Sequence, residues 1–435
     1  MAIDDIPFAL PSLGPEEEAA VIRVLRSRWL TTGREALAFE KEFAAYLENS
    51  AIKGADSNGT PNTGGTNTIG EARALALNSA TGGLHLALEA LGIGPGDVVL
   101  VPSYTFTASA EVVRYLGAEP VLVDSIPGAF NIDPEQLEQS IARLEKGLPA
   151  YERPGKAAGS TGARSGFGPR GKPRAIIPVH YGGLPCDMEA ILAIARKHGL
   201  TVVEDAAHAF PALLPDGSVA GTLGDAGVFS FYATKTITTG EGGMVFTRNE
   251  ALAKRIAVMR SHGIDRSVWN RYTDAASSWY YEVVEPGFKY NLPDILAAIG
   301  RVQLGRAASM LEQRRAIAAS YDRAFAGGPF IIPPSSKGDV RHLYPLRLQL
   351  DKISINRDTF IERLKEKGIG ASVHYVPLHL MPYYAKRQGL APDDFPEALK
   401  NYTECLSLPL WPDMGEARVN RVISAVLETA GTGQP

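Results

Sequence analysis

Two residues of the chain are of types that could work together in amino-group chemistry. Asp205 follows the apolar run at residues 201–204, and Lys235 stands in the loop after the run at residues 226–231. A lysine attacks a carbonyl only after losing its proton, and pyridoxal phosphate (PLP), which such a lysine binds as a Schiff base, needs a carboxylate opposite its pyridine nitrogen. Alone, a loop lysine is usually solvated and a strand-end aspartate often caps a helix. Together, Asp205 and Lys235 predict a PLP site.

A phosphate site is expected beside this pair. Residues 77–83 (L-N-S-A-T-G-G) lead directly into an apolar-periodic helix at residues 84–91. Small and hydroxylated residues at a helix N-terminus leave N–H groups free and direct the positive end of the helix dipole towards an anion. The same pattern is found at ordinary capped helices, so it supports a PLP site only together with Asp205 and Lys235.

The elements that must position these residues follow an α/β pattern. Short β-rich runs alternate with helical segments such as residues 188–198, and their nearly continuous apolar character is typical of strands buried on both faces of a mainly parallel sheet. Ligands of such sheets gather at the carboxyl ends of the strands. That rule points to residues 104–106, 180–183, 205–208 and 232–235. The predicted strands are residues 98–102, 120–123, 175–179, 201–204, 226–231 and 243–247.

The pattern changes after a long amphipathic helix predicted at residues 293–326. An alternating run at residues 343–350 and a helix at residues 357–367 come next. We therefore expect a large PLP-binding α/β domain, residues 1–326, and a smaller C-terminal α+β domain, residues 327–435.

Two stretches of the large domain differ in composition from the rest. After the helical periodicity of residues 15–47, which a turn-like break at residues 29–33 interrupts, a segment near residues 49–70 is crowded with Gly, Asn, Thr and Ser. A second Gly-rich segment lies near residues 155–172. Neither could bury enough apolar area to offset the cost of ordering, so both are predicted to be flexible surface insertions.

The composition excludes several classes of function. The 435 residues are 45% apolar and 21% charged with a net charge of −4, so no basic field attracts nucleic acid or an anionic membrane. No apolar run approaches the ~20 residues that span a bilayer, and the acidic N-terminus does not resemble a secretion signal. We expect a cytoplasmic protein with Cys186 and Cys405 as reduced thiols. His180, His342 and His379 lack metal-ligand spacing, so no metal is expected.

Several stretches together resemble the DegT/DnrJ/EryC1/StrS family of sugar aminotransferases. They occur in family order and extend over nearly the whole chain apart from the two Gly-rich insertions. The resemblance implies the fold type I (aspartate aminotransferase-like) architecture, PLP as the cofactor and a homodimer with active sites at the interface. The matching stretches are N-S-A-T-G-G-L-H-L-A-L, P-S-Y-T-F-T-A, E-D-A-A-H-A, F-S-F-Y-A-T-K-x-x-T-T-G-E-G-G, G-F-K-Y-N-L-P-D-I-x-A-A-I-G and S-V-H-Y-x-P-L-H.

The resemblance also implies catalytic roles for matching residues. Lys235 matches the Schiff-base lysine, which in the family also carries a proton between substrate and cofactor. Asp205 matches the partner of the pyridine nitrogen. Phe106 matches an aromatic ring that stacks on the cofactor, and His208 matches a Gln or His beside that ring.

The remaining cofactor contacts implied by the resemblance concern the phosphate group. Thr81, Gly82 and Ser230 match phosphate contacts within one subunit. Asn291 matches a residue that reaches the phosphate from the second subunit, whereas an isolated Asn in such a loop would otherwise indicate a turn.

Residues at the substrate side match the family less closely. His374 and Tyr375 match a segment that approaches the nucleotide-sugar in relatives, and Thr32 lies near the same mouth. Arg260 and His262 either face a diphosphate or form a solvated helix end.

The implied reaction moves an amino group from a donor, glutamate in the family, to a nucleotide-linked keto-sugar, giving an amino-sugar for lipopolysaccharide or polysaccharide biosynthesis. Three alternatives stay open: a PLP-dependent sugar dehydratase, a cyclitol aminotransferase and a non-catalytic PLP-binding regulator. Dehydratases of the family typically carry His at the position of Lys235, and one branch adds an iron–sulfur cluster. Lys235 and the presence of only two cysteines therefore count against the first alternative.

Overall fold

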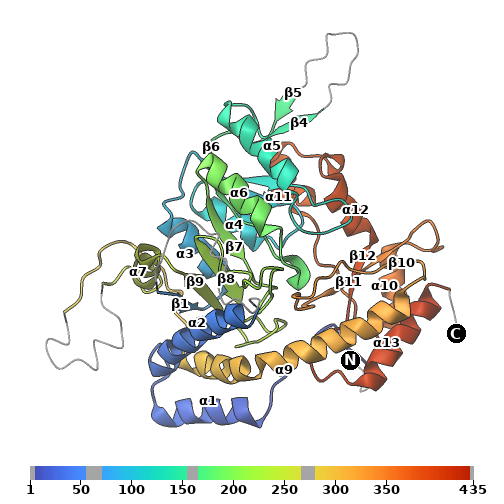
Figure 1. Ribbon diagram of the computed structural model, residues 1–435, viewed down its shortest axis with the longest axis horizontal. Coiled ribbons are helices and arrows are strands. Elements are labelled where there is room, and N and C mark those ends of the chain that lie inside the picture. The colour runs from blue at the N-terminus through green and yellow to red at the C-terminus, as the bar shows by residue number, and fades with distance from the viewer. Residues whose placement is uncertain (1–4, 55–70, 154–164, 266–279, 432–435) are drawn as a thin grey trace.

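The computed structural model describes residues 5–54, 71–153, 165–265 and 280–431 (Figure 1). Its centre is a seven-stranded sheet in the order β1-β9-β8-β7-β6-β2-β3. The strands from β8 to β3 are parallel to one another, whereas β9 is antiparallel to both β8 and β1. The predicted mainly parallel α/β sheet is therefore confirmed. The strands are β1 (Arg73–Leu77), β2 (Asp97–Pro102), β3 (Glu119–Val123), β6 (Lys172–Ile176), β7 (Thr201–Asp205), β8 (Ala226–Ser230) and β9 (Gly243–Thr247).

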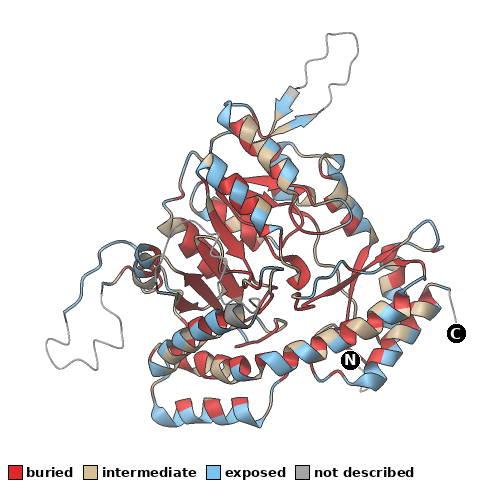
Figure 2. Cartoon of the chain, viewed as in Figure 1, coloured by how far each residue is buried: buried red, intermediate tan, exposed pale blue. Residues whose placement is uncertain are grey.

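Helices cover both faces of this sheet (Figure 1). Alternate side chains of a strand point to opposite faces, so Val99 and Val101 of β2 pack in the core beneath α3, α4 and α7, while Val98 and Leu100 pack beneath α5 and α6. Figure 2 shows the strands buried between these helical layers. The helices are α3 (Ala80–Ala90), α4 (Ala108–Tyr115), α5 (Pro134–Glu145), α6 (Met188–His198) and α7 (Glu250–Met259).

A long helix, α9 (Asp294–Phe325), joins the two cores of the molecule (Figure 1). Its first half packs with α2 (Arg34–Gly54) against β1, β8 and β9, through residues such as Leu304 and Met310. Its second half contributes Tyr321 and Phe325 to the C-terminal core. α1 (Pro15–Ser27) packs on the outer side of α9.

The C-terminal core surrounds a three-stranded antiparallel sheet in the order β10-β11-β12. Ile6, near the other end of the chain, also lies in this core and pairs with Ile369. The C-terminal core therefore includes a residue from before residue 327, and the division into domains at residues 326 and 327 stays a prediction. The strands and helices of this part are β10 (Phe330–Ile331), β11 (Tyr344–Leu348), β12 (Cys405–Leu408), α10 (Arg357–Glu366), α11 (Pro382–Gln388), α12 (Pro396–Glu404) and α13 (Glu416–Thr429), with short 3-10 turns η2 (Leu378–Leu380) and η3 (Pro392–Asp394).

Several sequence-based boundaries were wrong. β1 was not predicted, and the predicted insertion at 49–70 overlaps α2, which continues to Gly54. In the other predicted insertion, β5 (Ser165–Phe167) forms a hairpin with β4 (Tyr151–Arg153), and β6 begins at Lys172. Residues 55–70 and 154–164 lie outside the described residues.

The loop before β8 packs closely across this strand, with Gly221 against Gly227, and this contact predicts the effect of a substitution on stability. A Cβ on Gly227 would overlap the carbonyl oxygen of Gly221 and lie 2.7 Å from its Cα. Because both partners are backbone, Gly227→Ala should lower the free energy of unfolding by about 2–4 kcal/mol, measured by urea denaturation. As a control, a Cβ at the exposed position Gly305 of α9 would meet no heavy atom within 4 Å, so Gly305→Ala should raise the free energy of unfolding by about 0.5–1 kcal/mol. A Gly227→Ala variant as stable as wild type would contradict the tight crossing.

Candidate active site

The residues singled out from the sequence meet at the carboxyl edge of the large sheet. β2, β6, β7 and β8 run parallel, so their carboxyl ends lie at one edge, and they are followed there by residues 103–106, 177–183, 206–208 and 231–235. α3 begins at the same edge, directly after β1.

Asp205 ends β7 as a buried carboxylate with defined partners. Its Oδ2 accepts a hydrogen bond from the Ser109 hydroxyl at 2.8 Å, and its Oδ1 accepts the Ala207 N–H at 3.1 Å. Burial raises the pKa of Asp205, while these hydrogen bonds and the charge of Lys235 act in the opposite direction. A cation or protonated nitrogen placed against this carboxylate would therefore stabilise its charged form.

Lys235 lies in a tight loop after β8, where its N–H donates to the carbonyl oxygen of Tyr232 at 2.9 Å. Its side chain is half-buried. Burial lowers the pKa of the Lys235 amine to about 8, with Arg314 adding to the effect and Asp205 opposing it. A larger fraction of this amine is therefore uncharged near neutral pH than of an ordinary lysine, as attack on a carbonyl requires.

His208 links the two sides of the site. Its Nδ1 accepts the Gly182 N–H at 3.3 Å, so a neutral ring carries its proton on Nε2 and donates it to the Tyr375 hydroxyl at 2.9 Å. Burial lowers the pKa of His208 well below its ordinary value, and the charges of Lys235 and His374 add to this. Tyr375, whose pKa is raised by burial and then by Asp205, thus retains its own hydroxyl proton.

Phe106 and His374 border the same space. The ring of Phe106 is 54% exposed, and its centroid lies 5.6 Å from that of Tyr375. An exposed ring at the edge of a sheet that carries Asp205 and Lys235 is available to stack on a planar ligand. His374 Nδ1 lies 3.0 Å from the Ser407 hydroxyl, and burial, followed by the charge of Lys235, lowers the pKa of His374 to about 4.

The start of α3 has the form of an anion cradle. Ser79 caps the helix by accepting the Gly82 N–H at 3.0 Å, whereas the N–H groups of Ala80 and Thr81 precede any intrahelical acceptor. A Cβ on Gly82 would lie 3.2 Å from the Tyr290 ring, so only glycine lets this turn pack without displacement. The half-buried Ser230 ends β8 and accepts the Tyr232 N–H at 3.3 Å.

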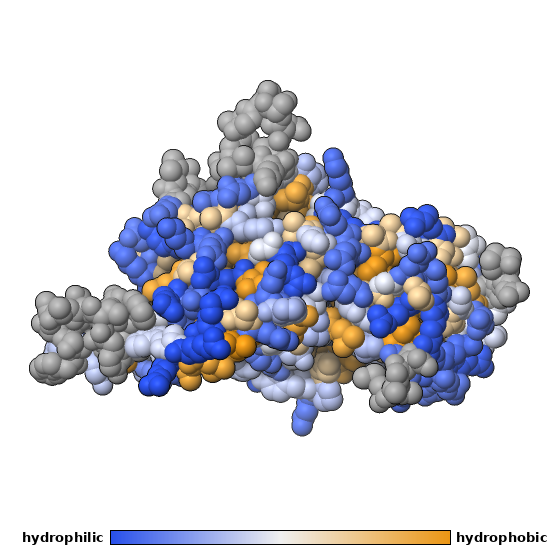
Figure 3. All heavy atoms as spheres, turned by 90° about the horizontal axis from the view of Figure 1, so that it is seen from below, coloured by the Kyte–Doolittle hydropathy of each residue, from blue (hydrophilic) through white to orange (hydrophobic). Residues whose placement is uncertain are grey.

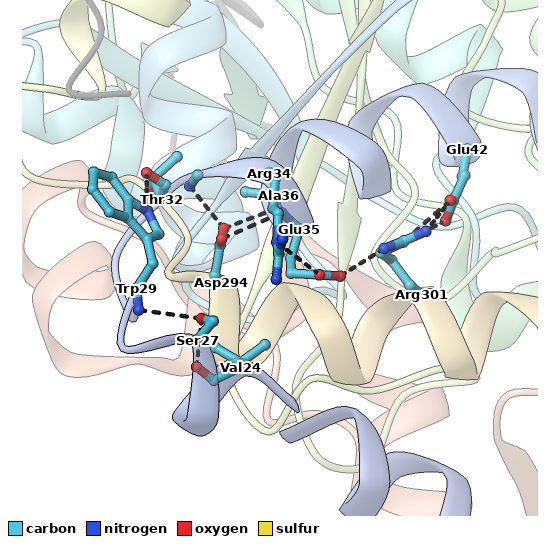
Figure 4. A network of polar contacts seen from close by, with 11 residues as sticks. Val24, Ser27, Trp29, Thr32, Arg34, Glu35, Ala36, Glu42, Asp294 and Arg301 are labelled. Atoms are coloured by element: carbon cyan, nitrogen blue, oxygen red, sulfur yellow. Dashed lines mark hydrogen bonds and ion pairs between the residues drawn. The ribbon is translucent and has the colours of Figure 1, made fainter. Parts of the chain in front are cut away.

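Thr32 and Asn291 lie together rather than at separate parts of the site. Asn291 Nδ2 donates to Thr32 Oγ1 at 2.6 Å, and Thr32 Oγ1 donates to the Leu292 carbonyl oxygen at 2.6 Å. The loop of Thr32 is fixed by Asp294, whose carboxylate accepts the N–H groups of Gly33 at 2.7 Å and of nearby α2 residues (Figure 4). Lys289 also donates to the Asn291 side chain.

Arg260 was expected either to face a diphosphate or to form a solvated helix end, and the structure shows neither. Its Nη1 pairs with Glu40 at 2.5 Å and donates to the Ala76 carbonyl oxygen at 2.9 Å, and the side chain is buried. The arginine is therefore neither a solvated helix end nor free to bind a diphosphate. His262 is exposed and its N–H donates to the Phe288 carbonyl oxygen at 2.7 Å.

Three residues of the site were not given a role from the sequence, although Tyr181 lies in the strand-end segment 180–183 that was singled out. Ser109 donates to Asp205, Tyr181 donates its hydroxyl proton to the His374 carbonyl oxygen, and the ring of His342 lies 4.5 Å from that of His208. Serine and tyrosine are too common for their type to signal such roles. The sequence gives no signal for His342 beyond the lack of metal-ligand spacing, because its place beside His208 comes from tertiary packing.

The donor set fits PLP. It combines an amine of lowered pKa, a buried carboxylate, an exposed aromatic ring and a helix N-terminus, which match the aldehyde, the pyridine nitrogen, the ring face and the phosphate. Among the described residues, no cluster of three His, Cys, Asp or Glu side chains could hold a metal ion. Within the same part of the chain, no helix is long and apolar enough to cross a membrane.

Known proteins of one family are similar to this chain over nearly its whole length. The profile of the DegT/DnrJ/EryC1/StrS aminotransferase family matches residues 11–61 and 66–427. The spore coat polysaccharide biosynthesis protein SpsC of Bacillus subtilis is 41% identical over 425 residues, which are 97% of this chain and 96% of SpsC.

Solved structures agree with this similarity. Spr1654 of Streptococcus pneumoniae, described as a sugar aminotransferase and solved in PMP and PLP forms, superposes with a TM-score of 0.80 for the PMP form at 29% identity, covering 98% of this chain and 100% of that one. PseC of Helicobacter pylori, an aminotransferase in the biosynthesis of pseudoaminic acid, gives 0.79 at 27% identity, covering 99% and 100%.

The lowered pKa of Lys235 predicts a pH-dependent stability of the cofactor-free protein. The pKa is about 8 in the folded chain against an ordinary 10.5, so between these values the unfolded chain binds more protons and wild-type stability rises with pH. Below pH 8 the cost of the buried charge is complete. Lys235→Met should therefore be more stable than wild type at pH 7, by about 1–3 kcal/mol once partial exposure is allowed for.

Urea denaturation at pH 7 and pH 10 measures this difference. The advantage of Lys235→Met should shrink at the higher pH, where the wild-type lysine is largely neutral in the folded state. Lys254→Met is the matched control, because this lysine is exposed on α7 beside Glu250, and its effect should stay within about 0.5 kcal/mol at both pH values. A gap for Lys235→Met that is independent of pH would show that the amine is not buried as a charge.

Proposed function

Because the chain belongs to the DegT/DnrJ/EryC1/StrS aminotransferase family, we propose that it transfers an amino group, from glutamate, to a nucleotide-linked keto-sugar. The chain is a PLP-dependent sugar aminotransferase, like its relatives. Glutamate as the donor and a nucleotide as the carrier of the sugar are what we propose and what the experiments below test.

The observation that carries the proposal is the pairing of Lys235 with Asp205 at neighbouring strand ends. The pKa of the amine is lowered to about 8 and that of the carboxyl group is raised, in each case chiefly by burial. Each group is thus shifted towards its neutral form and is stabilised when the other carries its charge. In our proposal, Lys235 would hold the cofactor and would carry a proton on its Nζ, while the Asp205 carboxylate would hold the ring nitrogen in its protonated form.

PLP, when bound, supplies a conjugated ring that withdraws electrons from the carbon attached to the amino group. Around it, Phe106 would lie against one ring face and His208 would fix the ring edge with its Nε2 proton already committed to Tyr375. Tyr375 and His374 would then face the sugar, since both come from the segment between α10 and η2 at the mouth of the site.

Phosphate binding is assigned to Thr81, Gly82 and Ser230, at the start of α3 and the end of β8. Their contribution is chiefly N–H groups and hydroxyls, which orient the phosphate without a buried cation. Such a site holds the cofactor in place during the half of the reaction in which Lys235 is not bonded to it.

A homodimer would complete this site. In the proposal, Asn291 and Thr32 contact the partner's site. Asn291 donates to Thr32, and Asp294 fixes the loop of Thr32 between α2 and α9 (Figure 4). Large apolar side chains are exposed on α1, at the start of α2 and on the segments before these helices, and Figure 3, seen from the side of α1, shows hydrophobic patches among hydrophilic ones. Apolar exposure of this kind marks interaction surfaces. The residues are Leu10, Leu13, Ile22, Leu25, Leu30 and Leu37, each between 44% and 55% exposed.

A spectrum of the PLP-loaded protein before and after glutamate tests the first half of the reaction. We expect the long-wavelength band of a lysine-bound PLP to be replaced by the shorter-wavelength band of pyridoxamine phosphate, and a nucleotide-linked keto-sugar to restore the first band. Lys235→Ala should never show the long-wavelength band. A band that ignores glutamate and every other amino donor would instead favour a dehydratase or a regulatory protein.

Asp205→Asn tests the second member of the pair. The amide keeps the shape of the side chain but no longer holds a negative charge at the ring nitrogen, so PLP should remain bound while the glutamate half-reaction slows by about 10²-fold or more. Single-turnover absorbance measures this rate. Ser109→Ala is the matched control, because it removes one hydrogen bond to Asp205 and should slow the rate less than tenfold. Equal rates for Asp205→Asn and wild type would remove Asp205 from the chemistry.

A further inference from the structure

Glu204, directly before Asp205, is a buried carboxylate on the opposite face of β7. Successive side chains of a strand alternate between faces, so Glu204 points away from Lys235. Its Oε1 accepts the N–H groups of Leu223 and Gly224, each at 2.7 Å, and its Oε2 accepts the Gly221 N–H at 2.7 Å. A fully buried carboxylate is stable only when it is satisfied in this manner, and here the donors belong to the loop that leads into β8.

The fourth donor to Glu204 is His180, which is also fully buried. His180 Nε2 lies 3.0 Å from Glu204 Oε2, and His180 Nδ1 accepts the Cys186 N–H at 3.0 Å. With Nδ1 placed as an acceptor, Nε2 carries a proton and donates it to Glu204. Burial acts to lower the pKa of His180, but Cys186 and Glu204 outweigh it and raise this pKa to about 10, so the proton that Nε2 donates to Glu204 is firmly held.

The turn that begins at His180 contacts three residues of the candidate active site. The His180 N–H donates to the Asp205 carbonyl oxygen at 3.1 Å. The hydroxyl of Tyr181 donates to the His374 carbonyl oxygen, and the Gly182 N–H donates to His208 Nδ1 at 3.3 Å. This last bond determines which nitrogen of His208 carries the proton that reaches Tyr375.

We infer that Glu204 and His180 are positioning residues of the transaminase site. They do not touch the reacting groups. The Glu204 carboxylate fixes the His180 ring, and the ring fixes the turn 180–182, which in turn orients His208 and the end of β7. The same carboxylate ties the loop 221–224 to β7 and so sets the spacing of β7 and β8, the strands that carry Asp205 and lead to Lys235. The inference rests on the proposed function.

Two substitutions of His180 separate the two bonds of its ring. In His180→Gln the side-chain amide reaches the position of Nε2 and can still donate to Glu204, but the Cys186 N–H loses its acceptor. In His180→Asn the amide oxygen replaces Nδ1 and can accept from Cys186, while Glu204 loses its side-chain donor. Glu204→Gln removes the negative charge and places the NH2 group of the amide against N–H groups that the carboxylate accepts in the wild type.

The matched control is Asp225→Asn, which neutralises a half-buried carboxylate at the end of the same loop. Asp225 accepts the Val202 N–H at 2.8 Å, near the opposite end of β7 from Asp205. This variant should leave the site unchanged.

The readouts are the visible circular dichroism of bound PLP, which reports ring orientation, and the pH midpoint of its long-wavelength band. The charges that act on Lys235 come from Asp205 and Arg314, and the nearby rings of His208, His342 and His374 respond to the charge of Lys235. Removing a buried negative charge lowers the midpoint, so we expect Glu204→Gln to shift it down by about one pH unit.

We expect His180→Asn to alter the dichroism and weaken PLP binding about tenfold, while His180→Gln and Asp225→Asn stay close to wild type. If Glu204→Gln and His180→Asn lose thermal stability yet keep the wild-type dichroism and midpoint, the pair only stabilises the fold and the inference is wrong. If Glu204→Gln does not fold, the two His180 variants still decide. Wild-type protein that binds no PLP, or binds it without response to glutamate, would contradict the proposed function itself. Failure of the proposed function is thus seen in the wild type, whereas failure of the inference is seen only in the variants.

Discussion

The fold depends on the carboxyl end of β7, where two consecutive carboxylates are buried on opposite faces of the sheet. Burying a carboxylate is unfavourable unless hydrogen bonds or a cation replace water. Glu204 obtains four donors on one face, and Asp205 obtains Ser109, Ala207 and the nearby charge of Lys235 on the other. These requirements explain why a Gly-rich loop crosses β8 so closely and why a turn of the chain is fixed beside His208. A single strand end thus constrains both the sheet and the site.

The long helix α9 imposes the second constraint, because it belongs to both cores. Its first residue, Asp294, accepts N–H groups from the loop of Thr32, and its last turn places Phe325 in the C-terminal core. Tyr375 and His374, which come from that C-terminal part, are therefore held at a fixed position relative to Asp205 and Lys235. The hydrogen bond and the ring contact between His208 and Tyr375 form a second link between the large sheet and the C-terminal part.

How much of this could be predicted depended on whether the signal was local. The helix α6 was predicted to the residue because its periodicity is bounded by the cap Asp187 and by Gly199 in the left-handed region. β1 was missed because R-A-L-A-L has little β-propensity and its strand conformation comes from pairing with β9. Lys235 and Asp205 were singled out through their residue types. No role was predicted for Ser109 or Tyr181, although Tyr181 lies in the predicted strand-end segment 180–183, since their contacts arise only from tertiary packing. Glu204 could have been found, because glutamate inside an otherwise apolar run is seldom buried without a partner.

The opposed shifts of Lys235 and Asp205 indicate what the site is built to bind. Without a ligand, burial lowers the pKa of the amine to about 8 and raises that of the carboxyl group, so each charge is held at a cost. A ligand that removes the charge of the amine by bonding to it, and that places a protonated nitrogen against the carboxylate, relieves both costs at once. Such preorganised strain is common where activity is gained at the expense of stability. The binding of PLP should therefore stabilise the fold through Lys235 and Asp205, the two side chains to which the proposed chemistry is assigned.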